Sequence, residues 1–260
     1  MLNTVLSAVG VYKLYEKWLR YQVKNGNKPE HIAIVLDGNR RWASERAMIS
    51  WMGHQFGADK VNRLLDWCMD LDVKSITIYA FSTENFQRPQ KEVDEIMKIA
   101  EEKMREILTD ERIHNNRVRV KVIGRQELLP KNLQQLIWEV EQATKDYDQH
   151  FLNVALAYGG RAEIVDATKK IAQKIENGEL SPEAINEDVF ENHLYTAHMP
   201  KQDPDLIIRT SGEERLSGFL LWQSVYSELC FLDVYWPDFR RIDLLRAVRT
   251  YQKRKRRFGQ

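Results

Sequence analysis

The 260-residue sequence predicts a single α/β domain, in which a mostly parallel six-stranded sheet is flanked by helices. From His31 onward, short apolar runs typical of strands alternate with longer segments whose apolar residues recur at helical spacing. These runs are apolar on both faces, which favours a sheet covered on both sides. Because no repeat, low-complexity tract or long linker divides the chain, we expect an N-terminal helix in residues 1–28 and one domain in residues 29–260.

The first 28 residues have the pattern of an amphipathic helix. Residues 2–23 place apolar side chains near helical spacing and intersperse them with lysines and an arginine. The turn-forming residues 25–29, Asn-Gly-Asn-Lys-Pro, end this helix. Two interpretations stay open. Lysines beside tryptophan and tyrosine suit a helix on a membrane surface, and the same pattern suits a helix that docks on its own domain or on a second copy.

The six predicted strands are short runs rich in isoleucine, valine and leucine. They are residues 31–36, 75–80, 118–123, 152–157, 206–208 and 230–235. Apolar residues at helical spacing predict five helices after residue 29: 54–70, 91–114, 131–146, 161–177 and 241–256. The alternation of the two kinds of segment is typical of parallel strands joined by crossover helices.

The composition excludes several classes of protein. The formal net charge of +1 argues against a general nucleic-acid-binding protein, which is usually distinctly basic. Cys68 and Cys230 lie far apart in apolar stretches, so we expect two buried free thiols in a reducing compartment. No stretch approaches the roughly 20 apolar residues of a membrane-spanning helix, and no signal peptide is recognisable. We expect a cytoplasmic protein, membrane-associated only if residues 2–23 lie on a bilayer.

Polar residues follow four of the predicted strands, at the sheet edge where function collects in such folds. The first strand continues directly into residues 37–42, Asp-Gly-Asn-Arg-Arg-Trp. A carboxylate, a glycine that frees backbone N–H groups and two arginines suit a magnesium-bound diphosphate at a helix N-terminus. The alternative is a helix cap with exposed arginines. The sequence signatures of dinucleotide-binding loops and of P-loops are absent.

The second strand ends in residues 81–89, Phe-Ser-Thr-Glu-Asn-Phe-Gln-Arg-Pro. Ser82 and Asn85 are candidates to orient a substrate or to take part in proton transfer, and Arg88 is a candidate phosphate ligand. A capping turn before the next helix is the alternative for this segment. After the fourth strand, Gly159 and Gly160 suit either close backbone approach to a ligand or an ordinary turn.

The fifth strand leads into a second candidate anion pocket. Arg209, Arg215 and Ser217 provide three donors within nine residues, and guanidinium groups pair bidentately with phosphate oxygens. An isolated arginine is usually a surface charge, but three donors after an apolar strand favour a binding site. Two arginine-bearing pockets with a single carboxylate, Asp37, beside the first indicate two phosphorylated substrates that are brought together.

Six motifs, taken in order, make the chain recognisable. They are HIAIVLDGNRRWA, YAFSTENFQRP, YGGR, DLIIRTSGEERLSGFLLWQSVYSEL, VYWPDF and RRFG. In order and spacing they resemble the cis-prenyltransferases, the family of undecaprenyl and dehydrodolichyl diphosphate synthases, from about residue 29 to residue 259. The resemblance implies a parallel sheet with a hydrophobic tunnel, usually in a homodimer. It also implies Mg²⁺-dependent transfer of an allylic prenyl group from its diphosphate to isopentenyl diphosphate, with formation of cis double bonds.

The resemblance also implies roles for individual residues. Asp37 matches the magnesium-associated aspartate needed for catalysis, and Asn85 matches the residue that assists removal of the isopentenyl proton. Glu228 matches a glutamate linked to the metal and to the partner subunit, and residues 257–259 match an element that reaches a neighbouring subunit's site. The loop that wraps the allylic diphosphate is matched by Gly38, Asn39, Arg40 and Arg41, with Trp42, His54 and Arg88 as its neighbours. A substrate-contacting segment is matched by Ser82, Thr83 and Glu84, and Phe86 is a further expected substrate-binding residue. The expected isopentenyl diphosphate pocket comprises Arg209, Arg215, Leu216 and Ser217.

One position departs from the family pattern. An arginine commonly stands four residues before the histidine of the GH motif, where it helps to hold the allylic diphosphate, and here that residue is Ser50 before His54. Losing one charge-assisted contact weakens binding by roughly 1.5–3 kcal/mol. Arg40 and Arg46 are candidates to compensate. The departure concerns the substrate preference and leaves the reaction class unchanged.

The growing chain needs an apolar environment, which two predicted helices can line. Candidate wall residues, each of which taken singly is better explained as plain core, are Val61, Leu64, Leu65, Ile96, Ile99, Ala100, Met104 and Leu108. Three rival functions stay open: prenyl transfer to a hydroxyl acceptor, a non-catalytic subunit of a heteromeric cis-prenyltransferase, and an unrelated phosphate-binding enzyme. The motifs do not specify the product length, the allylic starter or the physiological acceptor.

Overall fold

The fold is organised around one six-stranded sheet. The computed structural model describes residues 11–254, and residues 1–10 and 255–260 lie outside the described range. The strands are β1 (His31–Val35), β2 (Ser75–Ser82), β3 (Val118–Ile123), β4 (His150–Tyr158), β5 (Leu206–Arg209) and β6 (Glu228–Phe231). They follow the order β3-β4-β2-β1-β5-β6, and each neighbouring pair is parallel. The predicted α/β class and six-stranded parallel sheet are confirmed.

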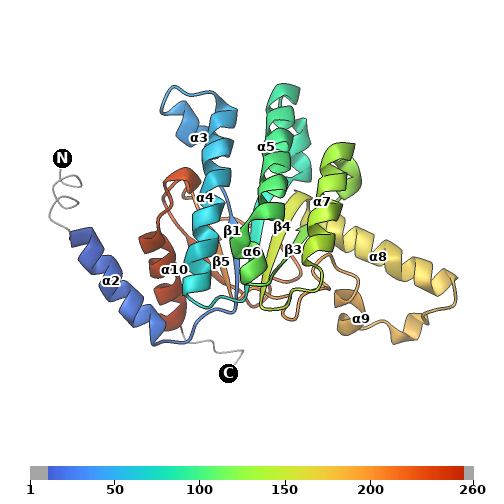
Figure 1. Cartoon of the computed structure of the whole chain (residues 1–260). Coiled ribbons are helices and arrows are strands. Elements are labelled where there is room, and N and C mark those ends of the chain that lie inside the picture. The colour runs from blue at the N-terminus through green and yellow to red at the C-terminus, as the bar shows by residue number, and fades with distance from the viewer. Residues whose placement is uncertain (1–10, 255–260) are drawn as a thin grey trace.

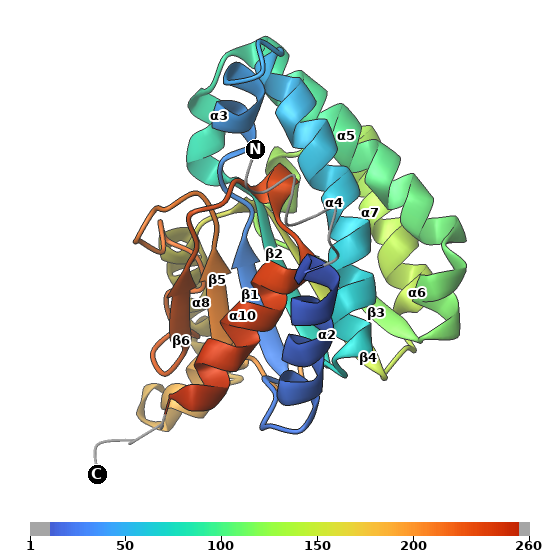
Figure 2. The same ribbon diagram turned by 90° about the vertical axis from the view of Figure 1, so that its left-hand side faces the viewer.

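Helices cover both faces of this sheet (Figure 1, Figure 2). The described helices are α2 (Val11–Lys24), α3 (Asn39–Ser44), α4 (Ser50–Asp70), α5 (Gln90–Thr109), α6 (Glu111–Asn115), α7 (Lys131–Thr144), α8 (Gly160–Glu176), α9 (Glu187–Glu191) and α10 (Arg241–Lys253). On one face lie α4, α5, α7 and α10, and on the other lies α8, with α9 packed beside it. The sheet is therefore buried on both sides, as its apolar strands predict.

Alternate residues of β1 enter two different cores, since side chains of a strand point to opposite faces in turn. Ile32 and Ile34 join the larger core, beneath α4, α5, α7 and α10. Ala33 and Val35 join a smaller core on the opposite face, which includes Tyr79. The larger core is the side on which a channel for an apolar ligand can form.

The strand order places a crevice at the carboxyl end of β1. From β1 the chain passes to β2 on one side of the sheet, and β5 is added later on the other side. Loops that leave β1 and β5 therefore diverge, and ligands of open parallel sheets bind where such loops part. The segments after β1, β2 and β5 are the ones that carry the predicted polar clusters.

Some predicted boundaries differ from those observed. The predicted helix 91–114 is two helices, because Asp110 leaves helical geometry and its carboxylate caps α6 by accepting the Arg112 N–H at 2.9 Å. The last strand ends at Phe231 rather than at residue 235, before a short 3-10 helix at Trp236–Asp238. The predicted helix 54–70 begins earlier, at Ser50. Helices α3 and α9 are not predicted, because five or six residues are too few to show periodicity.

The N-terminal helix α2 packs along α10 (Figure 2). Leu19 and Val23 are fully buried in this contact, and the Gln252 Nε2 donates to the Val23 carbonyl oxygen at 2.8 Å. One face of the helix is thus docked on its own chain, and residues 2–10 of the predicted helix lie outside the described residues. In the part of the chain that the structure describes, none of the helices combines the length and apolarity needed to cross a bilayer. Cys68 and Cys230 are buried free thiols, as predicted.

Candidate active site

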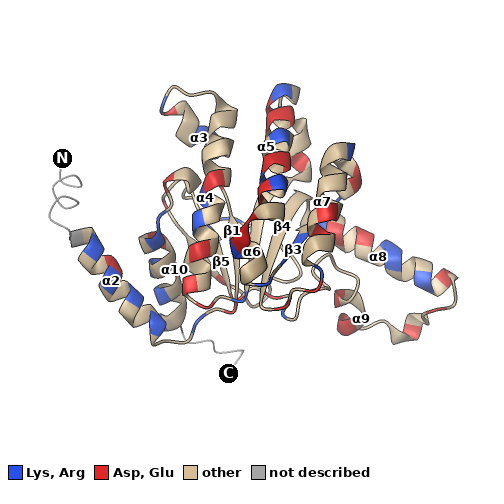
Figure 3. Cartoon of the chain, in the orientation of Figure 1, with Lys and Arg blue, Asp and Glu red and all other residues tan. Residues whose placement is uncertain are grey.

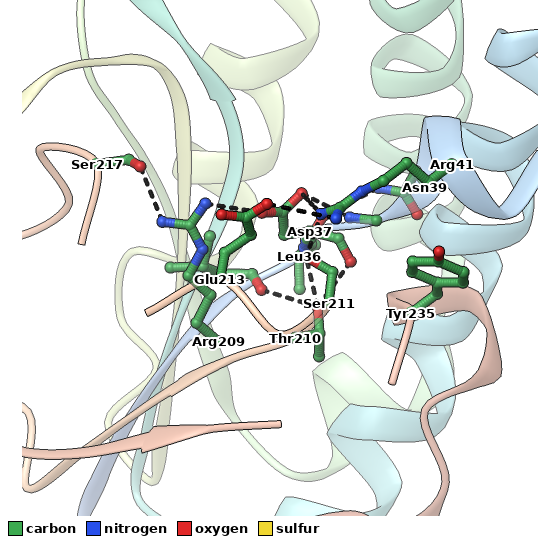
Figure 4. A network of polar contacts seen from close by, with 12 residues as sticks. Leu36, Asp37, Asn39, Arg41, Arg209, Thr210, Ser211, Glu213, Ser217 and Tyr235 are labelled. Carbon is green, nitrogen blue, oxygen red and sulfur yellow. Dashed lines mark hydrogen bonds and ion pairs between the residues drawn. The ribbon is translucent and has the colours of Figure 1, made fainter. Parts of the chain in front are cut away.

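The carboxyl ends of β1 and β5 are joined through one threonine. The Thr210 hydroxyl accepts the Asp37 N–H at 3.0 Å and donates to the Asp37 carbonyl oxygen at 2.7 Å. The next residue, Gly38, has φ +99°, and a Cβ there would lie 2.6 Å from a ring carbon of Tyr235, so the turn requires glycine. This backbone geometry fixes the Asp37 carboxylate at the edge of the sheet where the carboxyl ends of the strands lie (Figure 4).

A cleft of about 710 Å³ opens at this sheet edge, where segments that are distant in the sequence meet. Its walls come from the ends of β1, β2 and β5 together with α3, the start of α4 and the short 3-10 helix at Thr83–Gln87. The predicted site residues that line it are Asp37, Gly38, Asn39, Arg40, Arg41, His54, Ser82, Glu84, Asn85, Arg88, Arg209 and Ser217. The two arginine-bearing segments therefore face one space.

Arg209 forms the floor of one half of the cleft. Its side chain is only 5% exposed and lies between Ser217 and Asp37 (Figure 4). One terminal nitrogen, Nη1, donates to the Ser217 hydroxyl at 2.8 Å and to the Arg215 carbonyl oxygen, while Nη2 donates to Asp37 Oδ2 at 2.7 Å. Among the described residues, the buried Nε has no hydrogen-bond partner. This buried donor therefore lacks a partner among the described residues, which is unusual for a buried polar group.

Glu92 organises the other half of the cleft. This buried residue, in the first turn of α5, has one carboxylate oxygen that three cationic or polar groups approach. Its Oε1 lies 3.2 Å from Arg88 Nη1, 3.4 Å from Arg40 Nε and 3.5 Å from His54 Nε2. Buried charges need partners, and these four side chains satisfy one another. Together they form the Glu92 cluster.

Glu213 is a further carboxylate at the site. It lies 3.3 Å from Arg41 Nη1 and 2.5 Å from Arg215 Nη1. Arg41 is also 3.7 Å from the Asp37 carboxylate and donates to the Ser211 hydroxyl at 2.6 Å (Figure 4). Each of the predicted diphosphate-binding arginines is thus paired with a carboxylate. A bound diphosphate would take over guanidinium donors that the carboxylates hold in its absence.

The Asp37 carboxyl is ionised at neutral pH. Burial by itself raises its pKa, but the hydrogen bond and charge of Arg209, the Gly38 N–H and the charge of Arg41 together hold the pKa below its ordinary value. The Gly38 N–H donates to Asp37 Oδ1 at 2.6 Å. A carboxylate with this environment is a hard, negatively charged oxygen ligand that faces a cleft lined by cations.

His54 stands at the boundary between the polar cleft and the apolar space behind it. Burial, followed by the charges of Arg88 and Arg40, lowers its pKa from 6.5 to about 4, against the opposing influence of Glu92. The imidazole is therefore neutral at pH 7. A neutral ring can donate one hydrogen bond and accept one, so His54 can contact a diphosphate oxygen without adding a charge.

Two glycines of α4 bring the loop after β1 close to this helix. A Cβ at Gly53 would lie 2.0 Å from the Asn39 carbonyl oxygen, and one at Gly57 would lie 2.4 Å from Asn39 Oδ1. The Asn39 Nδ2 also donates to the Leu36 carbonyl oxygen at 3.0 Å. Close packing of this kind fixes the first turn of α3, and the N–H groups of a first helical turn are available to bind an anion.

Some predicted binding residues do not line the cleft: Trp42, Thr83, Phe86, Arg215 and Leu216. Trp42 packs against Phe56, and Phe86 packs edge-on against Phe81. Leu216 packs against the smaller core, and a Cβ at Gly159 would lie 2.8 Å from the Thr83 hydroxyl. Arg215 is 64% exposed and pairs with Glu213 at the rim. These residues support the lining or border it, and their predicted contacts with substrate stay a prediction.

Glu228 lies away from Asp37 within one chain. It opens β6 and is paired in register with Leu206, at the amino end of the sheet, whereas Asp37 follows the carboxyl end of β1. Its carboxylate lies 2.6 Å from Arg254 Nη1. A shared metal between Asp37 and Glu228 therefore requires a glutamate from a second copy, and the predicted role of Glu228 stays a prediction.

Ser50, the position that departs from the family pattern, lines the cleft at the start of α4. Of the two arginines that were candidates to compensate, Arg46 is engaged elsewhere. It pairs with Asp238 at 2.9 Å and its guanidinium stacks on the Trp42 ring at 4.4 Å. Arg40 lines the cleft itself, beside Glu92. Arg40 is therefore the better placed of the two.

An apolar channel of about 130 Å³ continues from the cleft between α4, α5 and the sheet. Cleft and channel share four residues, Leu36, Asn39, His54 and Ala80. Of the predicted wall residues, those that line the channel are Val61, Leu65, Ile96, Ile99, Ala100 and Met104. Leu64 and Leu108 belong to the adjoining core. The predicted apolar channel is thus present behind the polar cleft.

Glu92 and Glu213 are site residues that the sequence pattern alone did not reveal. A signal was available for Glu92, which precedes Ile96 and Ile99 by four and seven residues and so occupies the apolar stripe of α5. An acidic residue in such a stripe needs a buried cationic partner, and Arg88 precedes it by four residues. Glu213 carries no comparable signal, because it stands in a loop with no periodicity.

The donor set fits Mg²⁺ bound together with a diphosphate. Within residues 11–254, no group of three or more histidine, cysteine, aspartate or glutamate side chains is placed to hold a metal by itself. The ionised Asp37 carboxylate does face the cleft. Mg²⁺ in enzymes commonly binds one or two carboxylates and takes its other ligands from substrate phosphates and water. The Asp37 carboxylate, beside the two anion-binding halves, matches that pattern.

The chain is similar in sequence to undecaprenyl diphosphate synthases. Residues 35–259 match the family model described as "Putative undecaprenyl diphosphate synthase". A Methanocaldococcus jannaschii protein named tritrans,polycis-undecaprenyl-diphosphate synthase (geranylgeranyl-diphosphate specific) is 55% identical over 250 residues, which cover 96% of this chain and 89% of that protein. A Methanopyrus kandleri protein of the same name is 53% identical over 249 residues, covering 96% of this chain and 91% of that protein.

Solved structures agree with the sequence relatives. Lavandulyl diphosphate synthase from Lavandula x intermedia, in complex with dimethylallyl diphosphate, has a TM-score of 0.84 at 38% identity and covers 90% of this chain and 99% of that one. A probable undecaprenyl diphosphate synthase from Campylobacter jejuni has a TM-score of 0.72 at 31% identity, covering 90% and 100%. The family predicted from the six motifs is confirmed, and the chain belongs to the undecaprenyl diphosphate synthase family of cis-prenyltransferases.

Proposed function

We propose that this protein elongates geranylgeranyl diphosphate with successive isopentenyl diphosphate units, forming a cis double bond at each step, to a product of undecaprenyl length. The archaeal relatives that are more than half identical to the chain bear this activity in their names. The observation that carries the proposal is the single cleft with two arginine-bearing halves that opens into an apolar channel. Two diphosphates and one hydrocarbon chain fit that division of polar and apolar space.

The allylic diphosphate would lie in the half formed by the Glu92 cluster and the first turn of α3. Arg40, Arg88 and the α3 N–H groups are its donors, and the hydrocarbon tail would enter the channel past His54 and Ala80. The isopentenyl diphosphate would lie on Arg209 and Ser217. Holding both substrates in one cleft turns a bimolecular encounter into a positioned reaction.

We assign Asp37 as the protein ligand of Mg²⁺, with Glu228 of a second copy as a further candidate. When bound, the metal neutralises charge on the diphosphate leaving group and so lowers the barrier to breaking the allylic C–O bond. Arg41 and Arg209 contribute to the same charge neutralisation, since both place positive charge next to the Asp37 carboxylate. Low local polarity on the channel side strengthens these charge interactions.

We assign Asn85 to positioning the isopentenyl carbon whose proton is lost. Its Oδ1 accepts the Ser82 N–H at 3.0 Å, which fixes the carboxamide at the cleft wall. A carboxamide is not a base at neutral pH, so we expect the proton to leave to a diphosphate oxygen or to water that Asn85 and Ser82 orient.

We propose a homodimer that forms at the β6 end of the sheet. The loop before β6 exposes Val225 and Tyr226, and the edge strand begins at Glu228. Exposed apolar residues beside a sheet edge suit an interface between copies. Such an arrangement would bring Glu228 toward the neighbouring copy, where its family role is expected.

The test is product analysis of the purified chain alone with Mg²⁺. Labelled isopentenyl diphosphate and allylic starters of several lengths are supplied, and products are identified by mass spectrometry. We expect polyprenyl diphosphates, with geranylgeranyl diphosphate used best. A prenylated hydroxyl acceptor formed without isopentenyl diphosphate would favour O-prenyl transfer, for which the altered position Ser50 is the reason to look. Absence of product without a second protein would favour a non-catalytic subunit.

A further inference from the structure

Helix α2 has an exposed apolar stripe on the side away from α10. Leu14 is 69% exposed, Tyr21 is 71% exposed and Trp18 is 43% exposed. The three residues are spaced at i, i+4 and i+7, so they lie on one line along the helix. The opposite line, with Leu19 and Val23, is fully buried against the domain. The helix is therefore apolar on two sides, and among residues 11–254 only one of these sides is packed against the rest of the chain.

Cations border the exposed stripe along both edges. On one edge lie the exposed lysines Lys13, Lys17 and Lys24, for which the described residues provide no ion pair. On the other edge α10 supplies Arg246 and Arg249. Figure 3 shows that basic residues predominate along α2 and α10 on this flank of the molecule, whereas both signs of charge alternate along α5. Positively charged side chains thus border the apolar stripe on both sides.

The two arginines of α10 make cation–π contacts with aromatic rings of α2. The Arg249 guanidinium lies 4.7 Å from the centre of the Trp18 ring, and that of Arg246 lies 5.3 Å from the centre of the Tyr15 ring. Such pairs keep an aromatic body and a cation side by side. Tryptophan, tyrosine and basic residues gather at this depth in the headgroup region of a bilayer.

We propose that the stripe of Leu14, Trp18 and Tyr21, with its bordering cations from α2 and α10, docks the protein reversibly on the surface of an anionic phospholipid bilayer. The helix would lie in the plane of the interface, with the apolar stripe among the upper acyl chains and the cations at the headgroup phosphates. The 14 described residues of α2 are too few to cross a bilayer and are enough to lie on one.

Charge favours a lipid surface over a second copy of the chain. Two copies meeting through this face would bring lysines and arginines of the same sign together at the edges of the stripe, which opposes association. The surface is also convex, since it is one side of a single helix on the flank of the domain (Figure 2). A flat, fluid and anionic partner accommodates a convex cationic face without needing a matching groove.

The test uses the full chain and sedimentation with sucrose-loaded vesicles of phosphatidylcholine, with and without phosphatidylglycerol. We expect binding to the anionic vesicles that weakens as salt is raised, because exposed charges are screened. Replacing both Leu14→Ser and Tyr21→Ser should lower the partition coefficient about tenfold or more, through lost apolar burial. The variant Lys17→Gln should lower it about fivefold on anionic vesicles alone.

The matched control replaces exposed apolar residues elsewhere, Leu128→Ser with Val165→Ser. This control should sediment like the wild-type protein. Prenyl transfer without lipid should be the same in all these proteins, which shows that they fold and separates this test from that of the proposed function. No sedimentation of the wild-type protein with anionic vesicles, or equal loss in the control, overturns the proposal. A change of oligomeric state in the Leu14/Tyr21 variant, with vesicle binding unchanged, would identify the face as an interface between copies and also overturn it.

Discussion

In the cleft, arginines and carboxylates pair around about 710 Å³ of space, whereas the channel behind it holds about 130 Å³ between aliphatic side chains. An engineered apolar cavity of about 150 Å³ accommodates one benzene molecule. By that measure the channel has room for about one five-carbon unit. The diphosphate site is therefore formed before substrate arrives, and the hydrocarbon site has to widen already for a geranylgeranyl tail and further as the product grows.

The cleft and the channel differ because different interactions hold their walls together. Charge-assisted hydrogen bonds are directional, so Arg209, Asp37 and the Glu92 cluster hold a fixed geometry without ligand. Contacts between aliphatic side chains are weak individually and have no preferred direction. Helices α4 and α5 can therefore separate while an entering hydrocarbon replaces the contacts that they lose. We expect changes in the cleft to alter rates and affinities, and changes in the channel to alter product length.

The largest expected effect is that of Asp37→Asn. The substitution keeps a hydrogen-bond acceptor for Arg209 but removes the charge that we assign to Mg²⁺. Because several kcal/mol of charge stabilisation are lost in the transition state, kcat/KM should fall by about 10³-fold or more. The measurement is incorporation of labelled isopentenyl diphosphate, with the melting temperature as a check on folding. Glu45→Gln, at the end of α3, is the matched control and should keep near wild-type activity.

Separate substitutions in the two halves of the cleft should raise different KM values. Arg209→Gln should raise the KM for isopentenyl diphosphate about 10- to 100-fold, the worth of one charge-assisted contact, and Arg40→Gln should do the same for the allylic diphosphate. Each change should leave the other KM nearly unaltered. A lysine at position 209 or 40 should restore only part of the substrate affinity, because its ammonium group cannot form the bidentate hydrogen bonds of a guanidinium group. Equal effects of both variants on both KM values would show that the halves are not separate sites.

Most of the polar cleft could be predicted from the sequence. A parallel sheet brings the ends of its strands to one edge, so clusters after three strands, near Asp37, Ser82 and Arg209, had to meet once the strands were identified. The counter-charges were harder to predict. Glu92 acts from the first turn of a helix, and which arginines it reaches depends on how α5 lies across β1 and β2.

Two further features depend on geometry that no local pattern carries. Glu228 stands in a motif with Arg215 and Ser217 yet lies at the other end of the sheet, because β6 must begin at the edge where β5 begins. The width of the channel depends on the spacing of α4 and α5. Small residues such as Ala80 and Ala100 indicate neither a wide channel nor a narrow one until their neighbours are placed.

Bulky residues at two depths of the channel should shorten the product by different amounts. Ala80 lies where cleft and channel meet, and Ala100 lines the channel only. With a short allylic starter, Ala80→Leu should give the shortest products and Ala100→Phe products of intermediate length, since a block nearer the cleft stops elongation sooner. The initial rate of isopentenyl transfer should change little. Mass spectrometry of the products measures the lengths, and the same length from both variants and the wild-type protein would refute the channel assignment.

The smallest expected effect is a pH dependence of stability that arises from His54. Its native pKa is about 4, below the value of 6.5 expected in the unfolded chain. Between these values the unfolded chain takes up a proton that the native protein does not. The stabilisation is therefore complete above pH 6.5 and is lost as the pH falls toward 4. At pH 5 the loss amounts to about 2 kcal/mol.

The variant His54→Gln should lose about 2 kcal/mol less of its unfolding free energy than the wild-type protein when the pH is lowered from 7 to 5. Urea unfolding at the two pH values measures this difference, and parallel losses in the two proteins would contradict it. Saturating allylic diphosphate gives a second comparison. Its negative charge offsets Arg88 and Arg40, two of the causes of the low pKa, so the bound histidine should take up its proton at a higher pH. The wild-type protein with ligand should then resemble the variant in the slope of stability against pH, which would place His54 beside the diphosphate and not merely within the protein interior.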